Sequence, residues 1–230
     1  MSNKAVDYII VGQGLAGSCL ALHLLKQKKS IAVFSAPVQE SASRVAAGLF
    51  NPVTGKKLSL TWLAGELFPY LHAFYQEAER LTNEHFFFPM PVYRPFFSSG
   101  EQNEWMSKSL EGPFPAHVEV SKLPTFEDQV NNPFGGLLVK QCGYLDTARF
   151  LSAVQTLIQH RGTLIEECLY ENELTIEHDA VEYRGLRASK IIFCGGTSVN
   201  FSRFFFVASY SAIKGRGASA KNGGGCATNL

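Results

Sequence analysis

The sequence has no excess of charge of either sign. Its 230 residues include 21 basic and 20 acidic side chains, which gives a formal net charge of +1 when histidine is neutral. Proteins that bind nucleic acid through their electrostatic field usually carry a basic excess or a basic patch. The apolar runs of the sequence are also too short to span a bilayer. We therefore predict neither a nucleic-acid partner nor a membrane partner.

The sequence also has no C-x-x-C pair and no clustered histidines. Its five cysteines and six histidines are dispersed without the spacing of metal ligands or of a disulfide framework. The cysteines are therefore expected to be reduced and buried. No signal peptide precedes the first apolar segment. These features predict a cytoplasmic protein without a bound metal.

What the sequence does contain is a glycine motif between two apolar segments. Residues 7–34 read as a buried strand, the pattern Gly12-x-Gly14-x-x-Gly17, an apolar helix and a second buried strand, within the length of one βαβ unit. In such a turn Gly12 permits the tight bend, Gly14 lets the backbone approach a pyrophosphate, and Gly17 lets the helix pack close to the strand. The helix N-terminus then offers N–H groups to the phosphates. The motif predicts a dinucleotide-binding site.

The acidic residue that usually follows such a motif is missing. About 20 positions past the glycines, an acidic side chain normally binds the ribose hydroxyls. The second strand, residues 31–34, runs instead into Ser35 and Ala36. Ser35 can still hydrogen-bond a hydroxyl, but without charge assistance, which predicts a weaker hold on the adenosine half of a dinucleotide. Glu40 is either a substitute for the missing carboxylate or a solvated loop residue.

The composition changes beyond the second strand. Residues 41–62 are rich in small residues and turn formers, which suits a backbone that passes close to a flat ligand. Apolar residues then recur at steps of three and four over 63–81, which predicts a long amphipathic helix. Residues 86–139 begin with an aromatic segment interrupted by prolines and read mostly as strands. We interpret 86–139 as a β-rich domain inserted into the first domain.

The first domain resumes after the insertion. The sequence predicts a helix that begins at Asp146 or Thr147, a strand over 163–167, a hairpin over 174–184 and a last buried strand over 190–194. The expected domain boundaries are 1–85 and 140–203 for the first domain, 86–139 for the insertion, and 204–230 for a tail. Because Ser, Ala, Gly, Lys and Asn dominate the tail, we expect it to be disordered or aberrant.

Four of these segments together resemble the FAD-dependent oxidoreductases of the D-amino-acid oxidase and glycine oxidase type. They are residues 12–17, 43–52, 143–146 and 191–196. The glycine turn is shared with most nucleotide-binding enzymes, whereas the stretch Ala46-Ala47-Gly48 is more diagnostic. The resemblance implies an α/β fold in which a Rossmann-like FAD-binding domain is interrupted by a β-rich substrate domain. It also implies FAD as the cofactor.

The resemblance further implies which residues contact FAD. The small-residue segment around Gly48 would run beside the pyrophosphate and the flavin ring. The backbone of Cys168 and Leu169 would contact the adenine, and Gly195 with Gly196 would mark where the last strand meets the cofactor. The complete implied set is Gly12, Gly14, Leu15, Ala16, Gly17, Ser35, Ala36, Ser43, Arg44, Ala46, Ala47, Gly48, Leu49, Cys168, Leu169, Cys194, Gly195 and Gly196.

Oxidation of the C–N bond of an amine or amino acid is the activity that the resemblance implies. In that chemistry the flavin N5 accepts a hydride from the carbon that bears the nitrogen, so no protein nucleophile is needed. A cation would hold the substrate carboxylate, and Arg94 in the aromatic segment is the best candidate. The alternative for Arg94 is a surface arginine stacked on an aromatic ring. The expected partner is a small amine or amino acid, and no oligomeric state is indicated.

The end of the sequence differs from the family pattern. Members of the family continue past a Lys-Gly pair, here Lys214-Gly215, into further substrate-domain strands, whereas Arg216 and a run of small residues follow in this chain. We therefore expect a C-terminally truncated or frame-shifted member whose substrate domain is incomplete. A catalytically inactive flavin-binding fragment is the alternative function. An NAD-dependent dehydrogenase would lack its ribose carboxylate and would leave residues 43–52 unexplained.

Overall fold

The computed structural model of the protein describes residues 4–37, 41–54, 58–121, 126, 128–196 and 202–205. The chain forms two units, each of which is described by itself. The first unit comprises Met1–Ala46 and Thr147–Leu230, and the second comprises Ala47–Asp146. Glu40 lies outside the described residues, and so does the predicted tail over 204–230 except for Phe204 and Phe205.

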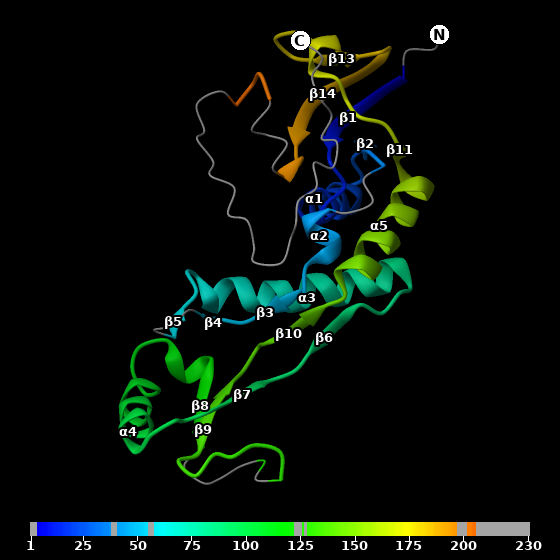
Figure 1. The fold of residues 1–230 in the computed structure, drawn as a ribbon. Helices are drawn as coiled ribbons and strands as arrows, with labels where there is room; N and C mark the ends of the chain where they lie inside the picture. The colour runs from blue at the N-terminus through cyan, green and yellow to red at the C-terminus, as the bar shows by residue number, and fades with distance from the viewer. Residues whose placement is uncertain are drawn as a thin grey trace. The chain divides into compact units, whose positions relative to one another are not determined.

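A six-stranded sheet forms the centre of the first unit (Figure 1). Its strands, in spatial order, are β11 (Thr163–Ile165), β2 (Ile31–Phe34), β1 (Lys4–Val11), β14 (Leu186–Phe193), β13 (Val181–Tyr183) and β12 (Leu174–Ile176). The first four strands are parallel, and β13 and β12 extend the sheet in the antiparallel sense. The prediction of an α/β fold with a parallel sheet is confirmed, and so is the hairpin over 174–184.

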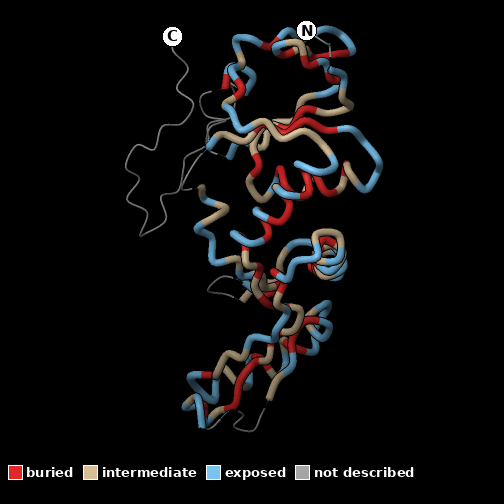
Figure 2. Tube along the Cα trace, turned by 90° about the vertical axis from the view of Figure 1, so that its right-hand side faces the viewer, coloured by how far each residue is buried: buried red, intermediate tan, exposed pale blue. Residues whose placement is uncertain are grey.

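The parallel strands are apolar on both faces, as strands covered on both sides must be. Ile9 and Phe34 belong to a buried cluster on one face. Ile10 and Val33, which alternate with them along the strands, are completely buried on the other face. Helices α1 (Leu15–Lys26) and α5 (Thr147–Arg161) pack against the parallel strands and against each other. Figure 2 shows the buried residues along these strands and helices.

The described part of the second unit contains two small sheets, a hairpin, two α-helices and the short 3-10 helix η1 (Phe114–Ala116). One sheet has the order β3 (Leu49–Phe50), β10 (Gly143–Leu145) and β6 (Phe87–Pro89), and the other has the order β7 (Val92–Pro95), β9 (Gly136–Val139) and β8 (Val118–Ser121). The hairpin pairs β4 (Val53–Thr54) with β5 (Ser59–Leu60), and the helices are α3 (Ala64–Thr82) and α4 (Ser99–Lys108). All pairs within these sheets are antiparallel.

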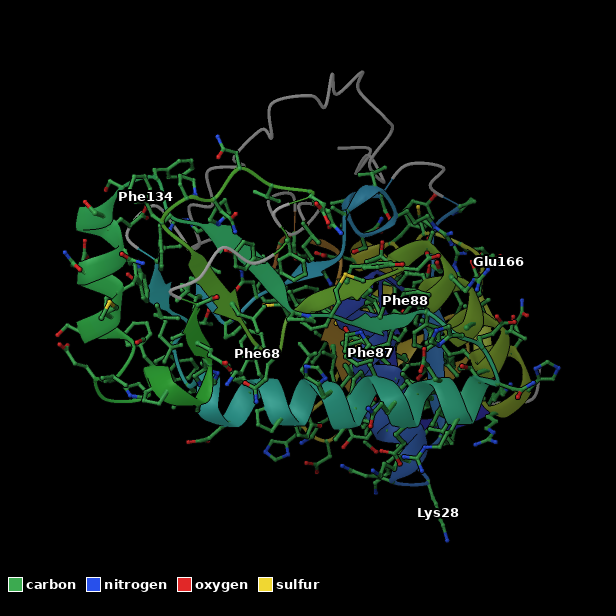
Figure 3. All side chains as sticks on the ribbon, turned by 90° about the horizontal axis from the view of Figure 1, so that it is seen from below. Lys28, Phe68, Phe87, Phe88, Phe134 and Glu166 are labelled. Atoms are coloured by element: carbon green, nitrogen blue, oxygen red, sulfur yellow. The ribbon has the colours of Figure 1, made fainter. Side chains whose placement is uncertain are left out.

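An aromatic cluster holds α3 against the first of these sheets. Phe87 on β6 is 1% exposed, and its ring stacks on Phe50 at 5.2 Å and on Tyr75 at 5.4 Å between ring centroids. The ring of His72 meets Phe87 edge-on at 5.2 Å. Figure 3 shows Phe87 on the side of β6 that faces α3 and Phe88 on the opposite side. The aromatic segment of the sequence therefore supplies a core residue and an outward residue in alternation.

The two units divide the chain at positions other than the predicted domain boundaries. The sequence analysis places boundaries at 85/86 and 139/140, whereas the units meet at 46/47 and 146/147. Helix α3 packs on β6, and β3 pairs with β10, so residues 47–85 share the core of the second unit. In the sequence, α3 reads only as an amphipathic helix, and its apolar periodicity does not tell which sheet it covers.

We predict that Phe87→Ala destabilises the second unit by about 3–5 kcal/mol, because it removes a buried ring and leaves a cavity. Both tryptophans of the chain, Trp62 and Trp105, lie in this unit, so tryptophan fluorescence during urea unfolding reports on it. Phe97→Ala is the control, since Phe97 is 79% exposed. Equal unfolding midpoints for the two variants would contradict the assignment of Phe87 to the core.

Candidate functional site

The glycine turn, residues 12–17, connects β1 to α1 at close quarters. Gly12 has a φ of +103°, and a Cβ on it would lie 2.6 Å from the carbonyl oxygen of Cys194. A Cβ on Gly17 would lie 1.9 Å from the carbonyl oxygen of Gly12. No side chain fits at either position, so both glycines are required by the packing of α1 against the ends of β1 and β14.

Gly14 is a glycine for a different reason. Its φ of −76° and ψ of −168° form an extended conformation that any residue adopts, so a side chain at this position would cause no backbone strain. The nearest atom to a Cβ placed on Gly14 is the hydroxyl oxygen of Ser43, at 3.1 Å. This distance is shorter than an ordinary van der Waals contact, so the side chain of Ser43 would have to shift by a few tenths of an ångström to admit a Cβ at position 14.

The N-terminus of α1 also lies beside Ser43. Gly14 is the N-cap and has no side chain to accept a bond from the helix, whose first N–H groups also have no carbonyl partner one turn earlier. The N–H of Leu15 donates to Oγ of Ser43 at 3.1 Å. Ser43 lies on α2 (Ala42–Val45), a single turn capped by the hydroxyl of Ser41, which accepts a bond from the N–H of Arg44. The segment after β2 thus brings a hydroxyl to the helix N-terminus.

Backbone hydrogen bonds align the carboxyl ends of the four parallel strands. The N–H of Gly12 donates to Phe34 at 2.8 Å, that of Ser35 to Ile165 at 2.9 Å, and that of Cys194 to Val11 at 2.7 Å. The segments after β1, β2, β11 and β14 therefore meet at one edge, which we call the carboxyl edge. In open α/β sheets this edge is where ligands bind.

Most of the implied FAD residues belong to this edge, but three belong to the second unit. Gly12 to Gly17, Ser35 and Cys194 to Gly196 lie at the ends of β1, β2 and β14. Cys168 and Leu169 follow β11. Ala47, Gly48 and Leu49 lie in the second unit, where Gly48 has a φ of +68° and a Cβ on it would be 1.9 Å from the carbonyl oxygen of Leu145. A role for these residues in cofactor binding stays a prediction.

Arg94 has a local partner for its charge. Its Nη1 lies 2.6 Å from Oε1 of Glu101, an ion pair outside hydrogen-bond geometry, and its guanidinium lies 5.7 Å from the centre of the Phe97 ring. This arrangement matches the alternative of an arginine stacked on an aromatic ring. A substrate carboxylate would have to compete with Glu101, and the binding role of Arg94 stays a prediction.

Thiol chemistry at the carboxyl edge is disfavoured. Cys194 is a free thiol, and burial raises its pKa above the ordinary value, so it is protonated at neutral pH and not poised as a nucleophile. Cys19 and Cys142 are also free thiols. Among the described residues, no group of three His, Cys, Asp or Glu side chains could hold a metal ion.

Gln13 is a residue of the turn whose role the sequence analysis missed. Its side chain is buried, and its Nε2 donates to Oγ of Ser18 at 3.0 Å and to the carbonyl oxygen of Leu151 at 2.9 Å. Both amide hydrogens are therefore used, one within α1 and one on α5. The position between the first two glycines is variable in the motif, and its partner Leu151 is 138 residues away in the sequence.

Comparisons with known proteins identify a family for the sequence and similar folds for the structure. The sequence model of the FAD dependent oxidoreductase (DAO) family matches residues 7–224. The fold is similar to glycine oxidase from Bacillus cereus ATCC 14579, with a TM-score of 0.62 and 15% identity over 83% of this chain and 55% of that one. It is also similar to L-proline dehydrogenase from P. horikoshii, with a TM-score of 0.65 and 11% identity over 93% of this chain and 58% of that one.

A third similar structure is the L-amino acid deaminase from Proteus myxofaciens, with a TM-score of 0.61 and 12% identity over 90% of this chain and 48% of that one. The chain thus spans about half the length of these proteins. At these identities the structural likeness concerns the fold. In the part of the chain that the structure describes, no helix combines the length and the apolar character needed to cross a membrane.

We predict that Gln13→Leu destabilises the first unit by about 1–3 kcal/mol, because it leaves the buried carbonyl of Leu151 and the hydroxyl of Ser18 without this donor. The control is Gln159→Leu on the exposed side of α5, which keeps helix propensity and should leave stability unchanged. Thermal unfolding followed by circular dichroism compares the two variants. A Gln13→Leu variant as stable as Gln159→Leu would show that the bridge from the turn to α5 contributes nothing.

Proposed function

Because the chain belongs to the family of FAD-dependent oxidoreductases, we propose that its carboxyl edge binds FAD and that it oxidises the C–N bond of an amine or amino acid. FAD is the cofactor of this family. The proposal assigns the pyrophosphate to the glycine turn, the ribose to Ser35 and the adenine side to Cys168 and Leu169. Each assignment is supported by a separate feature of the first unit.

The position of Gly14 beside the N-terminus of α1 and the hydroxyl of Ser43 is the observation that carries the proposal. Gly12 and Gly17 are explained by backbone packing, whereas a Cβ on Gly14 would cause no backbone strain and would crowd only the side chain of Ser43, at 3.1 Å, so backbone packing does not require a glycine there. A site for a pyrophosphate does require it, because the phosphate oxygens must come within hydrogen-bond distance of the N–H groups of α1. The hydroxyl of Ser43, already 3.1 Å from the N–H of Leu15, is positioned to donate to the same oxygens.

The neighbouring strand ends support the adenosine half of the proposal. Ser35 follows β2 directly and is half-buried, with its N–H fixed on Ile165 of β11. Its hydroxyl is then beside the position where a ribose would lie in this class of fold. Leu169 is 8% exposed and belongs to the apolar cluster on one face of the sheet, so the segment after β11 is anchored near its middle.

In the proposed chemistry the protein's own side chains bind and orient the cofactor and do not form a covalent bond with the substrate. When bound, FAD supplies the acceptor for the hydride that leaves the carbon bearing the nitrogen, and the amine becomes an imine. The residues of the carboxyl edge bind and orient the cofactor, and the protonated thiol of Cys194 adds no competing nucleophile. The names of the similar structures, which include oxidases and dehydrogenases of amino acids, support an amino acid as the substrate class.

A flavin titration followed by substrate addition tests the proposal. The purified chain is titrated with FAD, and bound flavin is recovered by filtration and quantified by its visible absorption. Glycine, L-proline and a neutral L-amino acid are then added without oxygen, and loss of the flavin absorption is recorded. Binding with bleaching by one of the amino acids supports the oxidase. Binding without bleaching supports the inactive flavin-binding alternative, and the absence of binding contradicts the proposal.

We predict that Gly14→Val lowers FAD affinity by more than about tenfold, a loss of at least about 1.4 kcal/mol. The new side chain would displace the hydroxyl of Ser43, which lies 3.1 Å from a Cβ at this position, and would cover the N–H groups of α1, while the negative φ of Gly14 lets the fold form. The control is Gly65→Val on α3, where a Cβ has no neighbour within 4 Å. FAD titrations of both variants, with circular dichroism to verify folding, make the comparison. A folded Gly14→Val variant with unchanged affinity would place the phosphates elsewhere.

We predict that Ser35→Glu tightens FAD binding by about 1–3 kcal/mol, because a carboxylate accepts hydrogen bonds from the ribose hydroxyls with charge assistance. Ser35→Gln is the matched control, since its side chain has the same length without the charge. Dissociation constants for FAD are measured for both variants and for the wild type. If Ser35→Glu binds no more tightly than Ser35→Gln, the ribose does not lie at the end of β2.

A further inference from the structure

We propose that Arg184 is a positioning residue that holds the segment 167–173 in the shape that recognises the adenosine half of FAD. The inference rests on the proposed function, because it assigns the adenine side to Cys168 and Leu169 within this segment. Arg184 is the last residue of the hairpin that the sequence predicts over 174–184, and it lies at the turn between β13 and β14. Its guanidinium nevertheless contacts both ends of the segment.

Two carboxylates connect Arg184 to the ends of the segment. Its Nη2 donates to Oε1 of Glu173 at 2.8 Å, and its Nε donates to Oε2 of the same carboxylate, so the pair is bidentate. Its Nη1 donates to Oε2 of Glu167 at 3.3 Å. Glu167 immediately precedes Cys168, and Glu173 ends the short turn that follows Tyr170. One guanidinium therefore fixes the distance between the two ends of the segment.

Aromatic contacts fix the middle of the segment. The guanidinium of Arg184 lies 5.6 Å from the ring centre of Tyr170 and 5.3 Å from that of Tyr183. The hydroxyl of Tyr183 accepts a hydrogen bond from the N–H of Tyr170 at 3.3 Å. The backbone just after Leu169 is thus fixed by a side chain of β13, and that side chain is packed under Arg184.

The backbone conformation at Arg184 is unfavourable for an arginine. Tyr183 pairs with Leu186, so Arg184 and Gly185 form a two-residue hairpin turn, and their φ values are +47° and +80°. Turns with two positive φ values favour Asn or Gly at the first position, and a long side chain is uncommon there. The turn conformation therefore disfavours an arginine at this position. The hydrogen bonds and ring contacts of the Arg184 side chain with the segment 167–173 offset that cost.

The ion pairs of Arg184 with Glu167 and Glu173 contribute little to the free energy of unfolding of the whole chain. The side chains of Arg184, Glu173 and Glu167 are 46%, 38% and 60% exposed, and ion pairs at such exposure contribute little to the free energy of unfolding. The hydrogen bonds from Arg184 lower the pKa of Glu173 below its ordinary value, so both partners are charged at neutral pH. A bidentate, stacked pair of this kind restricts the geometry of a loop more than it stabilises the fold.

The variant Arg184→Asn distinguishes an effect of Arg184 on the shape of the segment from an effect on the stability of the fold. Asparagine suits the positive φ of the turn, so the thermal midpoint should stay at or above that of the wild type. The shorter side chain cannot reach Glu173 and Glu167 together, so the segment gains freedom that FAD binding must remove. Arg187→Asn is the matched control, because Arg187 makes an ion pair of similar exposure with Glu177, away from the segment.

The measurements are the dissociation constant of FAD, competition by ADP against FAD, and the thermal midpoint. We expect Arg184→Asn to weaken FAD and ADP by the same factor, about tenfold, which is the order expected for the freedom of one loop residue. Arg187→Asn should bind both as the wild type does. Glu173→Gln, which keeps the turn sequence, should weaken both ligands, and combining it with Arg184→Asn should add no further loss.

The measurements distinguish a failure of the proposed function from a failure of the inference about Arg184. If the wild type binds neither FAD nor ADP, the proposed function fails, and the inference fails with it. If the wild type binds FAD but Arg184→Asn binds FAD within twofold of it, the inference alone is overturned. The inference is also overturned if Arg187→Asn loses as much affinity, if ADP keeps its affinity for Arg184→Asn, or if the weaker binding appears only with a lowered thermal midpoint.

Discussion

The close approach of α1 to the turn that precedes it is the constraint on which the rest of the first unit depends. A Cβ on Gly17 would meet the carbonyl oxygen of Gly12 at 1.9 Å, and one on Gly12 would meet that of Cys194 at 2.6 Å. Because only glycine fits at these two positions, α1 begins directly at the carboxyl end of β1. Its first N–H groups and the positive end of its dipole are therefore directed along one edge of the sheet.

Two kinds of polar contact then act in the first unit. Buried contacts, such as those of Gln13 to Ser18 and Leu151, connect the turn to the core, where each hydrogen bond affects the free energy of unfolding. Exposed contacts, such as those of Arg184 to Glu173 before the first residues of β14 and β12, contribute little to that free energy but restrict the segment between β11 and β12. Buried residues such as Gln13 therefore maintain the fold, whereas exposed residues such as Arg184 shape the segments around it.

The sequence predicts the parts of this arrangement that are local. The strand, turn, helix and strand of residues 7–34 are recognisable because their glycines and apolar runs follow each other directly. The hairpin over 174–184 is recognisable because two alternating segments flank a short loop, residues 177–180. Three contacts join residues that are distant in the chain or that belong to no recognisable motif. They are the contact between Ser43 and Leu15, the bridge from Gln13 to Leu151 and the ion pairs of Arg184. Periodicity and spacing carry no information about such pairs, and the same holds for the packing of α3 on β6.

Hydrogen–deuterium exchange of the chain with and without FAD tests the central claim most directly, since it locates the cofactor without any substitution. The account predicts that saturating FAD slows exchange in the backbone amides of residues 12–18, where the first turn of α1 would bind the pyrophosphate. It also predicts slower exchange in the segment 167–173. Unchanged exchange over residues 12–18 in a chain saturated with FAD would contradict the claim that this turn is the phosphate site.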